Sequence, residues 1–430
     1  MPKSGIFHFD FQENGERSRV HLRIDPDASG LLIVNASKIV HLNPTAAVMA
    51  YLILQNTTRE KAIQILTKTF DVSSNQALND YTHTADLLRE LIKPDGACPI
   101  HDLNLEFIHP FSSKPSAPYR MDLAITYRCN NDCSHCYNAR SRDYPELTIK
   151  NWFHILDLLW EIGIPHVVFT GGEPTLRDDL PELIAHAEHN GQITGINTNG
   201  RRLSDRNYVD SLVNAGLDHV QITLESHNPD IHDAMVNARG AWKQTVAGIQ
   251  NALETSLYVM TNTTMLSNNS PFLKQTLEFL ASIGVPTIGL NALIYSGKGL
   301  SVDTGIAESD LPSLLRIARE IISKHNQRLI WYTPTQYCNF DPMQLELGVK
   351  GCTAAMYNMC IEPNGDVIPC QSYYQTLGNI LTSPWTSIWN HDLSINLRWR
   401  KDIPEKCLVC PLVSECGGGC PLVMKIKGIN

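Results

Sequence analysis

Three cysteines, Cys129, Cys133 and Cys136, follow an apolar run and are separated by three and then two residues. Thiolates hold the irons of iron–sulfur clusters, so three ligands on one short loop can hold three irons of a cubane and leave the fourth iron open. An open iron can bind a substrate directly. The spacing therefore predicts a reactive iron–sulfur site on this loop.

Two other interpretations of these cysteines are open. Positions i, i+4 and i+7 form a stripe on one face of a helix, which would make the thiols ordinary buried side chains, although the stretch Asn130-Asn131-Asp132 favours a turn. A zinc site would need a fourth ligand, for which His135 is the candidate, but tetrahedral zinc sites usually come as paired short motifs. The alternation of elements around the loop decides between these interpretations.

Strands and helices alternate along the chain from Tyr119. The hydrophobic periodicity predicts strands at 121–126, 166–170, 193–197, 220–224, 258–264 and 287–293, and helices at 149–162, 179–189, 204–215, 242–255, 272–283 and 311–325. Six βα units with short connections predict an α/β fold, a partial (β/α)6 TIM-type barrel with its chemistry at the carboxyl ends of the strands. The cysteine loop lies at such an end.

Composition narrows the class of protein further. The chain has 430 residues, 43% of them hydrophobic, which suggests about two to four domains. A net charge of −9 without a basic stripe argues against nucleic acid as a partner. No apolar run reaches about 18 residues and the N-terminus lacks a signal peptide, so we expect a cytoplasmic protein without membrane contact. Of twelve cysteines, eleven follow residue 120 in metal-like spacings, which indicates metal rather than disulfides.

The CxxxCxxC spacing, followed by the aromatic Tyr137, resembles the signature of the radical S-adenosylmethionine (SAM) superfamily. In that family SAM chelates the open iron of a [4Fe-4S] cluster, so the resemblance implies both as cofactors. It also assigns the turn after the second strand to the amino group of SAM; that turn is Gly171, Gly172, Glu173 and Pro174.

Further polar residues follow the later strands and face the same mouth. The resemblance implies that Thr223 and Glu225 bind ribose, although Thr223-Leu224-Glu225-Ser226 departs from the usual Ser-Leu-Asp-Gly at three of four positions. The other candidates at strand ends are Asn197, Asn199, Asn262 and Thr264, and the loops carrying His232, Asp233, Gly240 and Gly297-Lys298-Gly299 fit the family as well. No catalytic acid or base can be named.

Residues 1–95 predict a separate N-terminal module. A hairpin with its turn at Asn14-Gly15, a second strand pair and three helices describe a winged-helix-like domain. Residues 1–90 hold nine Lys/Arg and ten Asp/Glu, which argues against DNA binding. The stretch 41–47 resembles the PqqD-like domain, the recognition element for ribosomally made, post-translationally modified peptides (RiPPs), which pairs with a precursor's leader by strand addition. Residues 96–118 are a proline-rich linker, in which Cys98 is an incidental thiol.

The cysteines of the C-terminal region, residues 331–430, form a second set with metal-ligand spacings, which comprises Cys352, Cys370, Cys407, Cys410, Cys416 and Cys420. They resemble the SPASM domain, which carries auxiliary [4Fe-4S] clusters beside a radical SAM barrel, here 119–330. By that resemblance the first auxiliary cluster is bound by Cys352, Cys370 and Cys420 with Cys338 as the candidate fourth ligand, and the second by Cys407, Cys410 and Cys416. The family's last cysteine is not found before Asn430, so we expect a non-cysteine ligand, an open iron, Cys360 in the vacant place, or only one auxiliary cluster. A zinc site made of Cys407, Cys410, Cys416 and Cys420 is the alternative.

Together these resemblances imply a radical SAM enzyme that modifies a precursor peptide, by a crosslink or another oxidation that begins with hydrogen abstraction. The leader would bind the N-terminal domain, and an electron donor such as flavodoxin or ferredoxin would reduce the cluster. The same chemistry on a cofactor or tetrapyrrole precursor, or on a folded protein, is the second hypothesis. A non-enzymatic iron–sulfur electron carrier is the third, but a carrier does not require the Gly171–Pro174 turn or six βα units.

Overall fold

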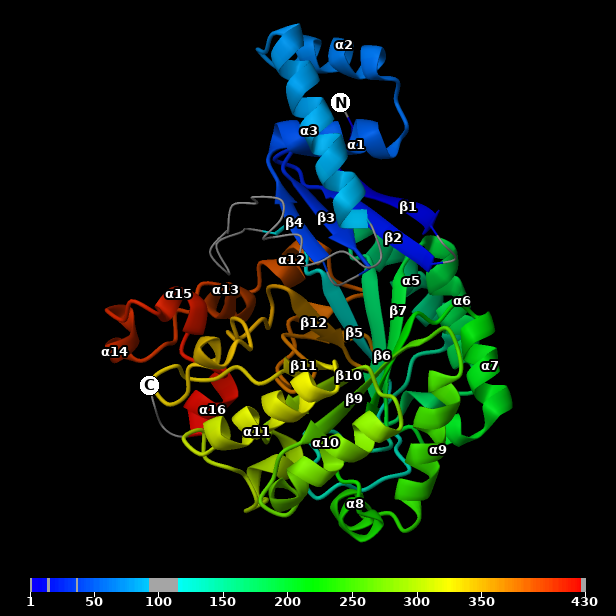
Figure 1. Cartoon of the computed structure of the whole chain (residues 1–430), viewed down its shortest axis with the longest axis vertical. Helices are drawn as coiled ribbons and strands as arrows, with labels where there is room; N and C mark the ends of the chain where they lie inside the picture. Colours follow the sequence, from blue (N-terminus) through cyan, green and yellow to red (C-terminus); the bar gives the residue numbers. More distant parts are fainter. Residues whose placement is uncertain (1, 14–15, 36–37, 93–114, 427–430) are drawn as a thin grey trace.

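The structure is a computed structural model that describes residues 2–13, 16–35, 38–92 and 115–426 (Figure 1). Cys98, the predicted turn at 14–15 and all of the predicted linker except residues 115–118 lie outside these residues. Within the described ranges, no helix is long and apolar enough to span a membrane.

The N-terminal part forms an antiparallel sheet in the order β1-β2-β3-β4, with α1 and α3 against one face and α2 packed on both helices (Figure 1). Its elements are β1 (Gly5–Glu13), β2 (Glu16–Ile24), β3 (Gly30–Val34), β4 (Lys38–Leu42), α1 (Pro44–Leu54), α2 (Arg59–Thr69) and α3 (Ser74–Ile92). The two strand pairs and the three helices that the sequence predicts are present in that order. The Asn43 side chain caps α1 by accepting a hydrogen bond from the Ala46 amide at 2.9 Å. The winged-helix identity of this unit stays a prediction.

The predicted barrel is present as a ten-stranded sheet in the order β11-β10-β9-β8-β7-β6-β5-β12-β13-β14. The strands β5 to β11 run parallel, and they are β5 (Arg120–Thr126), β6 (His166–Gly171), β7 (Ile193–Thr198), β8 (His219–Thr223), β9 (Tyr258–Thr264), β10 (Thr287–Asn291) and β11 (Arg328–Trp331). The helices are α5 (Ile149–Ile162), α6 (Leu180–Asn190), α7 (Arg206–Asn214), α8 (Pro229–Val236), α9 (Ala241–Leu253), α10 (Leu273–Ser282) and α11 (Leu311–Lys324). The α/β class and the partial barrel are confirmed.

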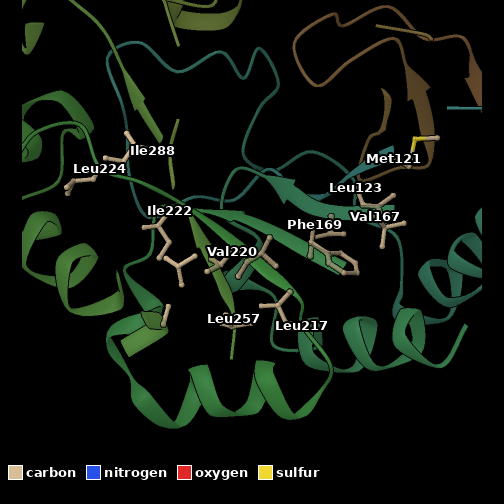
Figure 2. Close-up of a cluster of buried hydrophobic side chains, with 14 of the residues drawn as sticks. Met121, Leu123, Val167, Phe169, Leu217, Val220, Ile222, Leu224, Leu257 and Ile288 are labelled. Atoms are coloured by element: carbon tan, nitrogen blue, oxygen red, sulfur yellow. The ribbon is translucent and has the colours of Figure 1, made fainter. Parts of the chain in front are cut away.

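The hydrophobic core of the barrel lies between the sheet and its helices. Alternate strand residues supply it, and Figure 2 shows Leu123, Val167, Phe169, Val220 and Ile222 among them. Because successive side chains of a strand point to opposite faces, the remaining strand residues point into the barrel. The polar residues of the strand ends therefore share one interior.

The barrel contains two elements that the sequence analysis missed. Strand β11 has four residues, too few for a clear alternation. The start of helix α8 could have been predicted from Asn228 followed by Pro229, a typical N-cap pair. In the structure the Asn228 side chain accepts hydrogen bonds from the amides of Asp230 and Ile231.

The N-terminal sheet docks on the barrel through buried polar side chains. Its barrel-facing residues alternate with the apolar residues that pack on the helices. Arg19 forms ion pairs with Asp218 at 2.9 Å and Glu188 at 2.8 Å, while the His21 ring contacts the Gly191 carbonyl oxygen at 2.7 Å. Asp218 and Gly191 stand just before β8 and β7, so the N-terminal unit covers the amino ends of the barrel strands. The cysteine loop lies at the opposite end.

The C-terminal part extends the barrel sheet. Strand β12 pairs in parallel with β5, and it forms an antiparallel hairpin with β13 around Asn364-Gly365-Asp366. The elements are β12 (Asn358–Ile361), β13 (Asp366–Ile368), β14 (Gly378–Asn379), α12 (Trp385–Trp389), α13 (Asp392–Arg398), α14 (Glu405–Leu408), α15 (Val413–Cys416) and α16 (Pro421–Ile426). Short 3-10 helices complete the chain at η1 (Pro174–Leu176), η2 (Arg202–Ser204), η3 (Ser270–Phe272), η4 (Gly297–Leu300) and η5 (Pro342–Leu345).

Candidate cluster and cofactor site

The thiols of Cys129, Cys133 and Cys136 gather on the loop after β5. Burial raises the pKa of each thiol above its ordinary value, and neighbouring thiolates of the same trio contribute to the raised pKa of Cys129 and Cys133. These three side chains are therefore mutual neighbours in a desolvated site. Such thiols stay protonated alone and release their protons when a metal binds.

Cationic side chains hold the cysteine loop. Arg142 donates to the carbonyl oxygen of Cys129 at 2.8 Å, and Arg201 donates to the carbonyl oxygen of the next residue at 2.5 Å. The Lys298 backbone amide donates to the Cys136 carbonyl oxygen at 2.9 Å, while its ammonium, like the Arg142 guanidinium, pairs with the Asp132 carboxylate of the loop. Asp132 offsets part of the three positive charges, and the remainder would offset the negative charge of bound thiolates. Of the three, the sequence analysis named only Lys298.

The two glycines of the Gly171–Pro174 turn allow a close backbone approach. A Cβ on Gly171 would lie 2.1 Å from the Thr126 carbonyl oxygen, and one on Gly172 would lie 2.4 Å from that of Arg128. These carbonyls belong to the end of β5 and the start of the cysteine loop. The glycines therefore let the turn pack directly against the backbone that carries the cysteines.

We expect Gly172→Ala to lower SAM cleavage by about a hundredfold, because it must displace the backbone just before Cys129 and a misplacement of about 1 Å has an effect of that size. The measurement is the rate of 5′-deoxyadenosine formation under anaerobic reduction, together with bound iron. Gly284→Ala is the control, since nothing lies within 4 Å of its added Cβ, although its φ of +84° makes the substitution strained. Equal rates for the two variants would contradict this role.

Glu173 belongs to this turn, and its side chain connects the end of β6 to the end of β7. Its carboxylate accepts hydrogen bonds from the Thr198 hydroxyl at 2.6 Å and from the Asn199 amide at 2.7 Å. Burial raises the pKa of Glu173, although these hydrogen bonds act in the opposite direction. The Asn199 side chain in turn donates to the Asn130 side chain at 2.6 Å. Glu173 thus fixes the polar loop after β7 against the cysteine loop.

Glu225 pairs with a residue that the sequence analysis considered only as a zinc ligand. One carboxylate oxygen lies 2.9 Å from Nε2 of His135, and the other accepts from the Thr264 amide at 2.9 Å. Burial lowers the pKa of His135, but the charge and hydrogen bond of Glu225 outweigh it, so the pKa is raised. Within the described residues Nδ1 of His135 is buried without a hydrogen-bond partner. That atom is available to a bound group.

Three predicted site residues share the inner face of the barrel. Asn197 is the register partner of Gln221 on β8, and Thr223 is the register partner of Asn262 on β9. The Asn262 amide nitrogen donates to the Asn291 side chain at 2.8 Å, while its Oδ1 is buried without a partner among the described residues. The sequence analysis missed Gln221, which the strand period places on the same face.

The C-terminal hairpin is fixed to the cysteine loop. Glu362 is fully buried and accepts two hydrogen bonds from the Arg140 guanidinium, at 2.7 and 2.8 Å. The hydroxyl of Tyr137 donates to the Gln371 side chain at 3.2 Å. The two cysteine-rich regions are therefore neighbours across this contact.

The C-terminal cysteines form two groups. Burial raises the pKa of the Cys352 and Cys370 thiols, that of Cys370 to about 12. The charges of Cys420 and Cys370 raise the pKa of Cys352 further, and the charge of Cys420 also raises that of Cys370. Burial also raises the pKa of Cys407, whose thiol neighbours are Cys416, Cys338 and Cys410. The sequence analysis instead named Cys338 as the candidate fourth ligand of the first cluster, and that assignment stays a prediction. Cys360 is buried on β12 beside Asp122, and the charges of Asp122 and Cys370 add to the effect of burial in raising its pKa.

The donor set fits iron–sulfur clusters. Among the described residues, no three His, Cys, Asp or Glu side chains converge on a point where a single metal ion could bind. In a cubane each thiolate binds its own iron, so the ligands stand further apart than around one ion. Three grouped, partly buried thiols with adjacent cations are compatible with such a cluster.

Two family descriptions match the chain. Residues 123–291 match "Radical SAM superfamily" and residues 352–411 match "Iron-sulfur cluster-binding domain", the SPASM domain. The first gives the barrel a [4Fe-4S] cluster and SAM as cofactors, and the second supports auxiliary iron–sulfur clusters.

Relatives with similar sequences have different substrates in their names. A PqqA peptide cyclase of Streptomyces rochei is 28% identical over 71% of this chain and 84% of its own. An AdoMet-dependent heme synthase of Methanosarcina barkeri is 26% identical over 70% of this chain and 91% of its own.

Among solved structures, SuiB of Streptococcus suis bound to the precursor peptide SuiA is similar over 97% of both chains, with a TM-score of 0.70 and 18% identity. This likeness supports the fold over nearly the whole chain, including the N-terminal unit. The two family matches show that the chain carries a radical SAM domain followed by a SPASM domain, the organisation of a radical SAM/SPASM enzyme.

Proposed function

We propose that this enzyme modifies a ribosomally made precursor peptide whose leader binds the N-terminal domain, residues 1–95. The observation that carries the proposal is the buried polar interface that joins this unit to the barrel. A domain fixed in this way can present a tethered substrate at a constant distance from the site. The similarity to a PqqA peptide cyclase and the shared fold with SuiB, whose structure holds a precursor peptide, support a peptide substrate.

The chain's own residues supply positioning and exclusion of water. We propose that Cys129, Cys133 and Cys136 hold the cluster, which with SAM supplies a 5′-deoxyadenosyl radical for hydrogen abstraction. His135 and Glu225 form one wall beside these ligands, since the ion pair fixes the imidazole with Nδ1 unpaired. The side chains of Asn197, Thr223 and Asn262 lie on the inner face of the barrel. A polar interior of this kind would hold a substrate in one orientation, and a substrate that fills it would keep water from the radical.

The docking geometry sets a minimum length for the peptide. The N-terminal unit lies at the amino ends of the strands and the cysteine loop lies at their carboxyl ends. A strand of seven residues such as β5 spans about 23 Å at roughly 3.3 Å per residue. An extended peptide must therefore place about seven or more residues between its leader and the modified residue.

The test uses a candidate precursor peptide labelled with a fluorophore. Strand β4 is the last strand of the N-terminal sheet, and Ile39 on it is 42% exposed. We expect Ile39→Glu to weaken leader binding by about tenfold or more, because it removes burial of an apolar side chain worth about 1.5 kcal/mol or more. Fluorescence anisotropy measures the dissociation constant.

Ile317→Glu on α11 is the matched control, since Ile317 is 39% exposed and lies far from β4 in the fold. SAM cleavage without peptide should be unchanged in both variants. If both bind the peptide as tightly as the parent protein, the strand-edge proposal fails.

A second candidate substrate is an iron-free or iron-bound tetrapyrrole. The observation in its favour is the similarity to AdoMet-dependent heme synthases and an Fe-coproporphyrin III synthase, at 25–26% identity. A tetrapyrrole changes its visible absorption on binding, so titration of the enzyme with coproporphyrin distinguishes the two. A spectral shift with no peptide affinity would favour this substrate.

A further inference from the structure

The segment before Cys338 packs against the loop that carries Cys416. The Gln336 side chain donates to the Gly418 carbonyl oxygen at 3.2 Å, and the Tyr337 amide donates to Sγ of Cys416 at 3.4 Å. These contacts join two parts of the chain that are about 80 residues apart in sequence. Cys338 is the next residue along and is thereby held beside this loop.

Further contacts hold the segment before Cys338 on this loop. The Cys416 thiol donates to the Thr335 carbonyl oxygen at 3.6 Å. A Cβ on Gly419 would lie 2.9 Å from Cγ of Gln336, so the two segments pack directly on each other. Cys338 itself is exposed.

We propose that Cys338 is the fourth ligand of the second auxiliary cluster, together with Cys407, Cys410 and Cys416. This rests on the auxiliary clusters of the proposed enzyme but not on its peptide substrate. Four thiolates complete a [4Fe-4S] cubane, so this cluster would need no ligand from outside the described residues. The assignment leaves Cys352, Cys370 and Cys420 as the cysteine ligands of the first auxiliary cluster.

A cluster bound in this way has a structural consequence. Cys338 lies on the connection between β11 and the C-terminal part, and the other three ligands lie beyond α13. The cluster would close a loop of about 70 residues, which restricts the unfolded chain much as a disulfide does. Loss of Cys338 should therefore loosen the C-terminal end as well as the cluster.

The experiment compares iron and sulfide content and EPR spectra of the full chain after anaerobic reconstitution. We expect Cys338→Ala to lose up to about four irons of about twelve, or to give the EPR signal of a [3Fe-4S] cluster after mild oxidation. Cys360→Ala is the matched control and should keep all the iron. In double variants, adding Cys338→Ala to Cys410→Ala should cause no further loss of iron. Adding Cys338→Ala to Cys370→Ala should cause a further loss of iron.

Three results would overturn the assignment. Cys338→Ala could keep the iron content and spectrum of the parent protein, or its effect could add to Cys410→Ala but not to Cys370→Ala, which would place it at the first cluster. A parent chain that binds only about four irons would remove the auxiliary clusters altogether. Failure of leader binding, by contrast, changes none of these readouts and overturns only the peptide substrate.

Discussion

Cys133→Ala should abolish formation of 5′-deoxyadenosine from SAM. Only three cysteines are proposed to hold this cluster, and loss of one leaves two irons or more without a protein ligand, so the cubane is not retained. Iron content should fall from about twelve to about eight per chain if three clusters are present. The measurement is product formation by liquid chromatography under anaerobic reduction, with iron counted on the same sample.

Cys360→Ala provides the control for this variant. Cys360 is only 1% exposed and packs with Ala124, Tyr127 and Ile368, so its loss leaves a small cavity that costs about 1 kcal/mol. It should keep its iron and its rate of SAM cleavage. If Cys133→Ala produced 5′-deoxyadenosine at the parent rate, the assignment of the cysteine loop would be wrong.

The fold was largely predictable because its signals are local. Each barrel strand carries a short apolar run and each helix a repeat of 3.6 residues, and both periods survive in the structure at β5, β9 and α5 within a residue of the predicted bounds. The candidate ligands were predictable for a similar reason, since Cys129, Cys133 and Cys136 are close in sequence.

Contacts between distant segments were not predictable. The pairing of His135 with Glu225 joins residues 90 positions apart, and nothing in their spacing indicates it. The position of Cys338 depends on the packing of 335–338 against 416–419, which no local pattern encodes. The second buried face of the N-terminal sheet was not predictable either. Arg19, His21 and Arg23 are polar, as on a solvent-exposed strand face, but the barrel buries them.

This covered face has an energetic consequence at acid pH. Burial lowers the pKa of His21 to about 3 and that of His219 to about 4, and burial lowers the pKa of His166, which hydrogen-bonds His219, in the same direction. All lie below the value of about 6.5 for histidine in an unfolded chain. As pH falls below about 6.5, the unfolded chain binds protons that the folded chain does not, so folding stability decreases.

We therefore expect acid to destabilise the docked N-terminal unit. At pH 5.5 each such histidine costs about 1.4 kcal/mol relative to neutral pH, so His21 and His219 together cost about 3 kcal/mol. His21→Gln should remove about 1.4 kcal/mol of that loss, because glutamine does not titrate there.

Anaerobic denaturant unfolding at pH 7.5 and 5.5 measures this change in the free energy of unfolding. Iron release affects parent and variant alike, so the difference between them isolates the histidine, and His83→Gln at an exposed site of α3 should change nothing. A His21→Gln variant with the full acid loss of the parent would show that the interface histidine does not control docking.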